Sequence, residues 1–207
     1  MDIQFHGANC ITIATKQVRF VFDDTLEALG AKSVVREGDI ALFTSAHATL
    51  PKAKMTIDLP GEYEVSGALI HGMQSRSHLD TDAERNAVMY KIVIGDVKVL
   101  VVGHAFPKLS EAKLEDIGLV DIMLIPVGGN GYTIDPVGAM QIVKDVEPKI
   151  VVPTHYADDS LQYEVPQQTL DDALKTMGVE VSETVKKLQF KVSEAADSTR
   201  FVVIEKS

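Results

Sequence analysis

Short runs of β-branched and apolar residues, separated by turn residues, fill the first half of the chain and constrain its fold more than any other feature. Such runs are typical of successive β-strands. The last two runs are separated only by Gly95 and Asp96, which predicts a tight hairpin. We expect strands near residues 2–5, 10–14, 18–22, 40–44, 55–59, 63–65, 68–73, 87–94 and 97–102.

The apolar period changes in the second half to one that is typical of helices alternating with strands. Ser110 can cap the first of these helices, which Gly118 ends, and Asp135 followed by Pro136 begins the second. We expect helices over 111–117, 137–146 and 168–177, and strands over 121–126, 149–153, 187–192 and 199–204. Strands first, helices later and no break in composition predict a single α/β domain over residues 1–207, a layered sandwich with helices outside packed sheets.

Composition narrows the classes of function. Thirty acidic against twenty basic side chains give a formal charge of −10, which disfavours nucleic acid as a partner because its binders need a basic surface. The longest apolar runs have strand length, far below the roughly 20 residues of a membrane helix. The first residues also lack the basic start and apolar stretch of a secretory signal. We therefore expect a cytoplasmic protein that contacts no membrane.

The single cysteine, Cys10, lies in an alternating apolar run. One thiol can form neither an internal disulfide nor a cysteine-rich zinc site. We expect Cys10 to be buried and unreactive rather than a nucleophile.

Three of the six histidines follow the ends of expected strands: His47, His104 and His155. Because ligands bind outside the carboxyl ends of strands in α/β sheets, the three imidazoles could converge on one site. Three histidines with an open fourth position are an arrangement that catalytic zinc sites use. The alternative is that these histidines are ordinary polar loop residues, which spacing alone favours.

Two adjacent carboxylates, Asp23 and Asp24, follow another expected strand. They could orient a ligand histidine, as metal-bound imidazoles usually require, or they could simply form a turn. The other histidines, His6, His71 and His78, are expected to have structural or solvent roles.

Four stretches carry a more specific signal: Asp39–His47, Pro60–Val65, Ile125–Gly129 with Tyr132 and Thr133, and Lys149–Tyr156. Together with the order of elements, they resemble the metallo-β-lactamase superfamily, and in particular small bacterial members near the L-ascorbate-6-phosphate lactonase branch. The resemblance spans nearly the whole chain. It implies an αββα sandwich of two mixed sheets with helices on the outer faces, and metal-dependent hydrolysis with one or two zinc or manganese ions that activate a water.

The resemblance also implies a ligand motif, Thr-His-x-His-x-Asp-His, of which this chain keeps little. Residues 44–50 occupy the positions of this motif. Of the motif's histidines, only the second, His47, is present. The motif's other ligands and its water-orienting aspartate are replaced by Ser45, Thr49 and Leu50.

The remaining ligand positions are partly kept. His155 matches the final family histidine, and His104 stands where the family has the aspartate that bridges two metals. A further ligand histidine would fall near Ser77, one position from His78, and Asp23 matches a supporting acidic residue. Two divalent ions about 3.5–4 Å apart need bridging negative charge, so we expect no standard two-metal centre.

Two functions of different classes follow. The first is a metallo-β-lactamase-fold protein with an altered or lost di-metal centre, a catalytically impaired or divergent hydrolase homologue that keeps its site for ligand binding or assembly. The second is an active hydrolase of a phosphorylated or lactone-like metabolite, with a single zinc or manganese ion on His47, His104 and His155. The substitutions favour the first, and the sequence leaves open whether the chain is an enzyme. A small-molecule ligand and homo-oligomers are implied by the resemblance.

Overall fold

Two mixed β-sheets form the centre of the computed structural model, which describes residues 1–47, 52–77, 87–190 and 198–207. The five-stranded sheet has the order β1 (Asp2–Gly7), β2 (Cys10–Ala14), β3 (Arg19–Phe22), β4 (Ile40–Leu42) and β5 (Met55–Ile57). The eight-stranded sheet has the order β12 (Val181–Val185), β13 (Arg200–Ile204), β11 (Ile150–Thr154), β10 (Ile122–Pro126), β9 (Val97–Val101), β8 (Ala87–Ile94), β7 (Ala68–Ser75) and β6 (Gly61–Val65). Parallel and antiparallel pairs occur in both, so the predicted pair of mixed sheets is confirmed.

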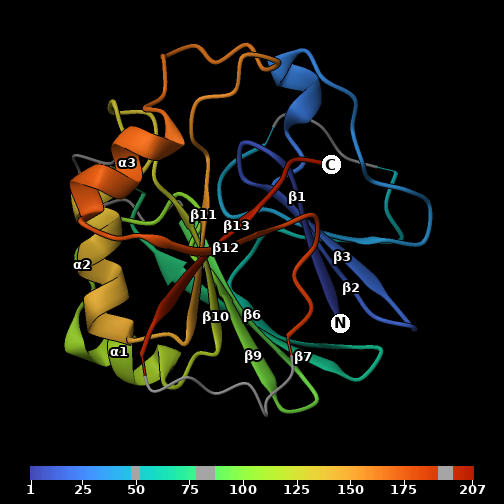
Figure 1. The fold of residues 1–207 in the computed structure, drawn as a ribbon. Helices are drawn as coiled ribbons and strands as arrows, with labels where there is room; N and C mark the ends of the chain where they lie inside the picture. The colour runs from blue at the N-terminus through green and yellow to red at the C-terminus, as the bar shows by residue number, and fades with distance from the viewer. Residues whose placement is uncertain (48–51, 78–86, 191–197) are drawn as a thin grey trace.

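The three α-helices lie together on the outer face of the eight-stranded sheet (Figure 1). They are α1 (Glu111–Ile117), α2 (Pro136–Val146) and α3 (Leu170–Met177). The predicted caps are confirmed, because Ser110 accepts a hydrogen bond from the Lys113 amide and Asp135 accepts one from the Gly138 amide. The apolar faces of the helices pack against the outer side chains of the central strands and bury them.

The outer face of the five-stranded sheet is covered differently from what the sequence predicts. In the described part of the chain it carries a 3₁₀ helix, η1 (Leu26–Leu29), followed by an extended loop over residues 30–39, instead of an α-helix. Leu26 and Leu29 pack on Cys10 and Val21 of the sheet. Gly30 adopts a left-handed conformation that ends η1 after four residues.

The main core lies between the two sheets. Strands of both sheets contribute alternate apolar side chains, with Ile3, Phe5, Phe20 and Tyr90 among those almost completely buried.

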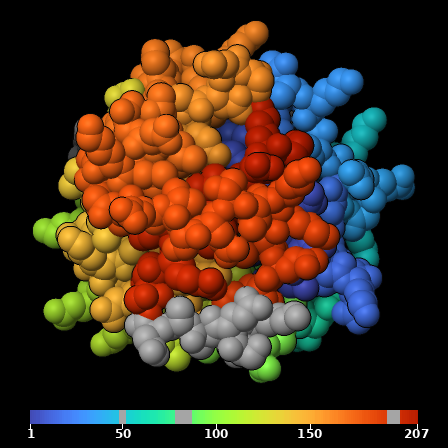
Figure 2. Space-filling view, viewed as in Figure 1, coloured from blue at the N-terminus to red at the C-terminus, as the bar shows by residue number. Residues whose placement is uncertain are grey.

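Residues beyond about 150, orange to red, make up most of the face shown in Figure 2. Within the described residues, no helix is long and apolar enough to cross a membrane.

One predicted strand was wrong. The strand expected over 187–192 is replaced by β12 over 181–185, and residues 191 and 192 lie outside the described part of the chain. Leu188 and Phe190 are buried as their alternation predicted, but Leu188 makes only an isolated bridge to Ile3. The side chains of β12 are mostly exposed, so an edge strand of this kind leaves no hydrophobic alternation in the sequence.

The predicted burial of Cys10 is confirmed, since none of its surface is exposed and burial raises the pKa of its thiol. We expect a thiol reagent at neutral pH to label the native protein only on the timescale of unfolding, because thiolate is the reactive form. Labelling of one thiol per chain within the mixing time in urea is the control. Equally fast labelling of the native protein would contradict the prediction.

Candidate functional site

The carboxyl ends of three parallel strands, β9, β10 and β11, meet at one edge of the eight-stranded sheet. His104 follows β9 and His155 follows β11, and their ring centroids lie 5.4 Å apart with the rings nearly perpendicular. His155 is 3% exposed, and its backbone has a φ of 52°, a left-handed conformation that turns the chain sharply after the strand. Two of the three predicted strand-end histidines are thus in contact.

A buried asparagine in the turn between β1 and β2 connects these strand ends. Asn9 Nδ2 donates to His104 Nε2 at 3.1 Å, and Asn9 Oδ1 accepts from the Thr154 hydroxyl at 3.0 Å. The His155 amide also donates to the carbonyl of Ala8 at 2.8 Å. With Asn9 Nδ2 as the donor, His104 Nε2 is the acceptor of this hydrogen bond.

Two tyrosines complete an aromatic cluster around His155. The ring centroids of Tyr132 and Tyr163 lie 5.5 Å and 5.4 Å from that of His155. The Tyr163 hydroxyl donates to the carbonyl of Tyr156 at 3.2 Å. Burial raises the pKa of both cluster tyrosines, so their phenols are neutral, and the Tyr163 hydroxyl uses its proton in the bond to Tyr156.

Asp23 supports the site through Thr44. Its Oδ1 accepts from the Thr44 amide at 2.7 Å, and its Oδ2 accepts from the Thr44 hydroxyl at 2.6 Å. Burial raises the pKa of Asp23 to about 6, although the two hydrogen bonds and the charge of His47 act in the opposite direction. Thr44 in turn packs against Gly103, because a Cβ at Gly103 would lie 2.1 Å from the Thr44 hydroxyl oxygen. The carboxylate therefore holds the residue that abuts the backbone beside His104.

Asp24 has the turn-forming role that was the alternative for the pair. Its Oδ2 accepts from the Ser33 hydroxyl and from the amides of Val34 and Val35. This carboxylate thus shapes the loop over residues 30–39 and not the strand-end site.

His47 contacts Phe43 and Asp58. Its ring stacks on Phe43 with 3.7 Å between centroids, and its Nε2 lies 3.3 Å from Asp58 Oδ2. Ser45 and Ser77, which stand at or near family ligand positions, each form an isolated β-bridge. Thr49, Leu50 and His78 lie outside the described residues.

The fit of a metal can be judged from these donors. Among the described residues, no three histidine, cysteine, aspartate or glutamate side chains are arranged to hold a metal ion. His104 Nε2 already accepts from Asn9, and His47 Nε2 lies beside Asp58. The described donors therefore do not fit the two-metal centre implied by the family motif, and the ligand assignment to His47, His104 and His155 stays a prediction.

Sequence reasoning missed Asn9 and Tyr163, and it named Tyr132 only as part of a stretch that carries the family resemblance, without a role in the site. Tyr132 and Tyr163 lie in loops that follow β10 and β11, and Asn9 is one residue in a tight turn. For Asn9 and Tyr163 the only available signal was position near a strand end, which many polar and aromatic residues share.

Comparisons with known proteins agree with this architecture. The family model described as "Beta-lactamase superfamily domain" matches residues 2–155. A UPF0173 metal-dependent hydrolase of Salinibacter ruber is 33% identical over 89 residues, which are 43% of this chain and 38% of that protein. The match thus spans well under half of the curated relative's length.

Solved structures extend the likeness to nearly the whole chain. A Thermotoga maritima protein, assigned as a zinc-dependent hydrolase of the metallo-β-lactamase superfamily, is 25% identical, with a TM-score of 0.73 and coverage of 99% of this chain and 98% of that one. An isothiocyanate hydrolase from Delia radicum gut bacteria shares the fold at 13% identity, with a TM-score of 0.62 and coverage of 97% and 96%. Because the family model covers well over half of the sequence, this chain belongs to the β-lactamase superfamily, with the metallo-β-lactamase fold.

Proposed function

We propose that this chain is a divergent metallo-β-lactamase-fold protein whose di-metal centre is altered or lost, and that its strand-end site binds a small-molecule ligand. The observation that carries the proposal is the hydrogen bond from Asn9 Nδ2 to His104 Nε2. It engages the imidazole that stands where the family has its bridging aspartate.

Charge supports the same conclusion. A bridging carboxylate offsets the repulsion between two divalent ions, whereas a neutral imidazole supplies no negative charge. The described residues offer no third acidic or imidazole ligand beside His104 and His155. Replacing the bridge and engaging its substitute in a protein hydrogen bond both act against a two-metal centre.

The same cluster offers what a small organic ligand needs. The ring centroids of Tyr132, Tyr163 and His155 lie 5.4 to 6.5 Å from one another, and aromatic side chains are common in small-molecule sites. The formal charge of −10 still disfavours nucleic acid. A single domain, a cytoplasmic location and assembly into homo-oligomers stay predictions from the sequence.

Elemental analysis and a substrate panel test the proposal together. Untagged protein, purified without chelator, should contain fewer than two metal ions per chain. It should hydrolyse no phosphodiester, lactone or β-lactam substrate above background, with or without added zinc or manganese. Two bound ions, or metal-dependent turnover that disappears in His155→Ala, would overturn the proposal.

A second candidate is a single-metal hydrolase of a phosphorylated or lactone-like metabolite. The contact between the His104 and His155 rings favours it, because two good ligands already share one sheet edge. Since His47 is not arranged with His104 and His155 to hold an ion in this structure, its side chain would have to move to join them. In that case one zinc ion should bind per chain, and His47→Ala, His104→Ala and His155→Ala should each abolish binding. His71→Ala, on β7 and paired with Glu62, is the matched control that should retain the ion. Zinc binding that survives all three site variants would rule this candidate out.

A further inference from the structure

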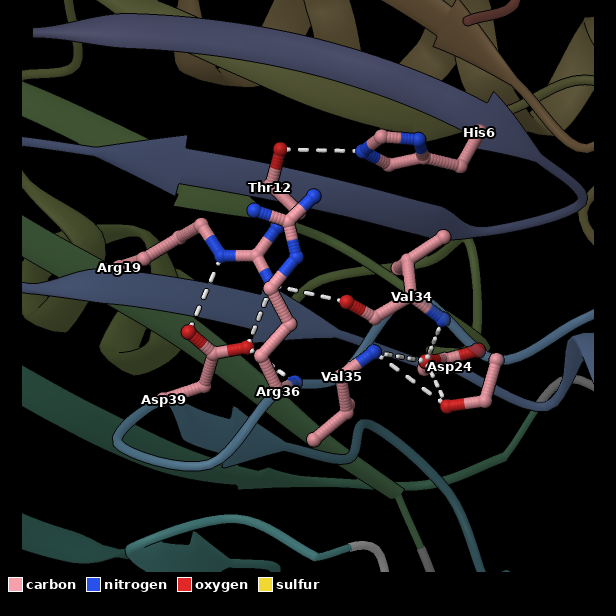
Figure 3. A network of polar contacts seen from close by, with 9 residues as sticks. His6, Thr12, Arg19, Asp24, Val34, Val35, Arg36 and Asp39 are labelled. Atoms are coloured by element: carbon pink, nitrogen blue, oxygen red, sulfur yellow. Dashed lines mark hydrogen bonds and ion pairs between the residues drawn. The ribbon is translucent and has the colours of Figure 1, made fainter.

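A pocket of about 430 Å³ lies on the outer face of the five-stranded sheet, away from the strand-end histidines. Side chains from β1, from β3, from the loop over residues 30–39 and from the last residue line it. Figure 3 shows His6 of β1, Arg19 of β3 and Arg36 of the loop. The polar side chains that line it are those of Gln4, His6, Arg19, Ser33, Arg36 and Ser207. The loop that follows η1 supplies four of the lining residues: Ser33, Val34, Val35 and Arg36.

Arg19 is held rigidly in this pocket. Its Nε donates to Asp39 Oδ1 at 3.0 Å, and its Nη2 donates to Asp39 Oδ2 at 2.6 Å and to the carbonyl of Val34 at 2.8 Å. These bonds fix the plane of the guanidinium but use only two of its three nitrogens, Nε and Nη2. Among the hydrogen bonds of the described residues, none uses Nη1, so a second pair of N–H donors is available on a preorganised group.

Arg36 places a second guanidinium beside the first. Its amide donates to Asp39 Oδ2 at 2.6 Å, which anchors the loop, and its side chain is exposed. In Figure 3 this side chain runs alongside that of Arg19 towards Thr12 and His6. Asp39 offsets the charge of Arg19, so an anion here would draw chiefly on the charge of Arg36 and on the N–H donors of both guanidinium groups.

The nearby carboxylates do not line the pocket. Asp39 is occupied by Arg19 and by the Arg36 amide, and Asp24 accepts from the backbone of the loop. No aspartate or glutamate is among the described residues that line the pocket, although the chain carries ten more acidic than basic side chains. The described side chains of the lining thus carry two guanidinium groups and no carboxylate, although Asp39 and Asp24 are bonded to residues of the lining.

His6 lies within range of both guanidinium groups. Its Nε2 lies 3.0 Å from the Thr12 hydroxyl and its Nδ1 lies 2.8 Å from the Ser207 hydroxyl. Burial chiefly lowers the pKa of His6; the charge of Arg19 lowers it further, that of Asp24 raises it, and that of Arg36 lowers it by a smaller amount. Both guanidinium groups are therefore close enough to act on a ring in the pocket wall.

We propose that this pocket binds a small phosphate-type oxyanion, either inorganic phosphate or the phosphate group of a small metabolite, held by Arg36 and Arg19. A guanidinium fork matches the spacing of phosphate oxygens and bonds them in pairs. The volume lies within the range of small-molecule sites. The site is independent of the strand-end chemistry, since it shares no residue with it.

An NMR titration of the full chain with inorganic phosphate, at constant ionic strength against chloride, tests the proposal. Saturable shifts are expected for the amides of residues 34–36 and for the His6 ring. Arg36→Gln should weaken phosphate binding by about tenfold or more. The affinity of Arg36→Lys should lie between those of the wild type and Arg36→Gln, because lysine keeps the charge but lacks the paired N–H donors of the guanidinium. Lys32→Gln removes the same charge from an exposed residue of the same loop outside the lining, and should change binding by less than about twofold.

Three results would overturn it. Shifts that do not saturate would show only general electrostatic attraction. Equal losses in Arg36→Gln and Lys32→Gln would have the same meaning. Acetate that binds as tightly as phosphate would replace the phosphate assignment by a carboxylate site. A phosphomonoester that competes with inorganic phosphate and binds more tightly would identify a metabolite as the source of the phosphate group.

Discussion

Replacing Gly103 by alanine is expected to lower the free energy of unfolding by about 3 kcal/mol, since it combines overpacking with backbone strain. An added Cβ would lie 2.1 Å from the Thr44 hydroxyl oxygen and 2.2 Å from its Cβ, far inside contact distance. Thr44 is fully buried and hydrogen-bonded to Asp23, so its side chain cannot move away from the added Cβ without breaking that bond. The φ of Gly103, 56°, adds the strain of a left-handed conformation.

Gly95→Ala separates these two causes. Gly95 has nearly the same φ, 59°, but no atom lies within 4 Å of the Cβ it would gain. Replacing it by alanine should lower the free energy of unfolding only by the strain of the left-handed backbone, about 1 kcal/mol. Urea unfolding of both variants measures the difference. Equal losses would mean that the added methyl group at position 103 is accommodated beside Thr44 without overpacking.

Stability is also expected to fall as the pH rises from about 4 to above 6, because of Asp23. The pKa of this carboxyl is about 6 in the native protein, against an ordinary value of 3.8, and burial is the main cause. The native state therefore binds the proton more tightly than the unfolded state does, and deprotonation favours unfolding. Each tenfold difference in proton affinity is about 1.4 kcal/mol, so this loss amounts to about 3 kcal/mol.

Asp23→Asn should remove this contribution from the pH dependence, since an amide of the same shape does not titrate in this range. The free energy of unfolding, measured in urea from pH 4 to 7, should become flatter by about 3 kcal/mol over that interval. Asp96→Asn changes an exposed carboxylate in the turn between β8 and β9 and is the matched control. An unchanged slope in Asp23→Asn would show that the carboxyl is ionised in the native protein at all these pH values.

The amino-acid sequence by itself determined the local structure and the family. Alternation predicted most strands, the 3.6-residue period with Ser110 and Asp135 predicted α1 and α2, and the run around Cys10 predicted its burial. These features depend on residues close together in the chain, where propensity, capping and hydrophobic period act directly. Quoted motifs were specific enough to predict a fold that the comparisons confirm.

Only the tertiary structure decided what surrounds the candidate residues. Asn9 meets His104 across 95 positions of sequence and meets Thr154 across 145, so no local pattern could pair them. The pocket over Arg19 and Arg36 depends on which segment covers the outer face of the five-stranded sheet. The side chains of β12 are mostly exposed, so its sequence shows no hydrophobic alternation. A sequence states which side chains are present, whereas strand order and the packing of loops decide which of them touch, and chemistry at a site depends on that contact.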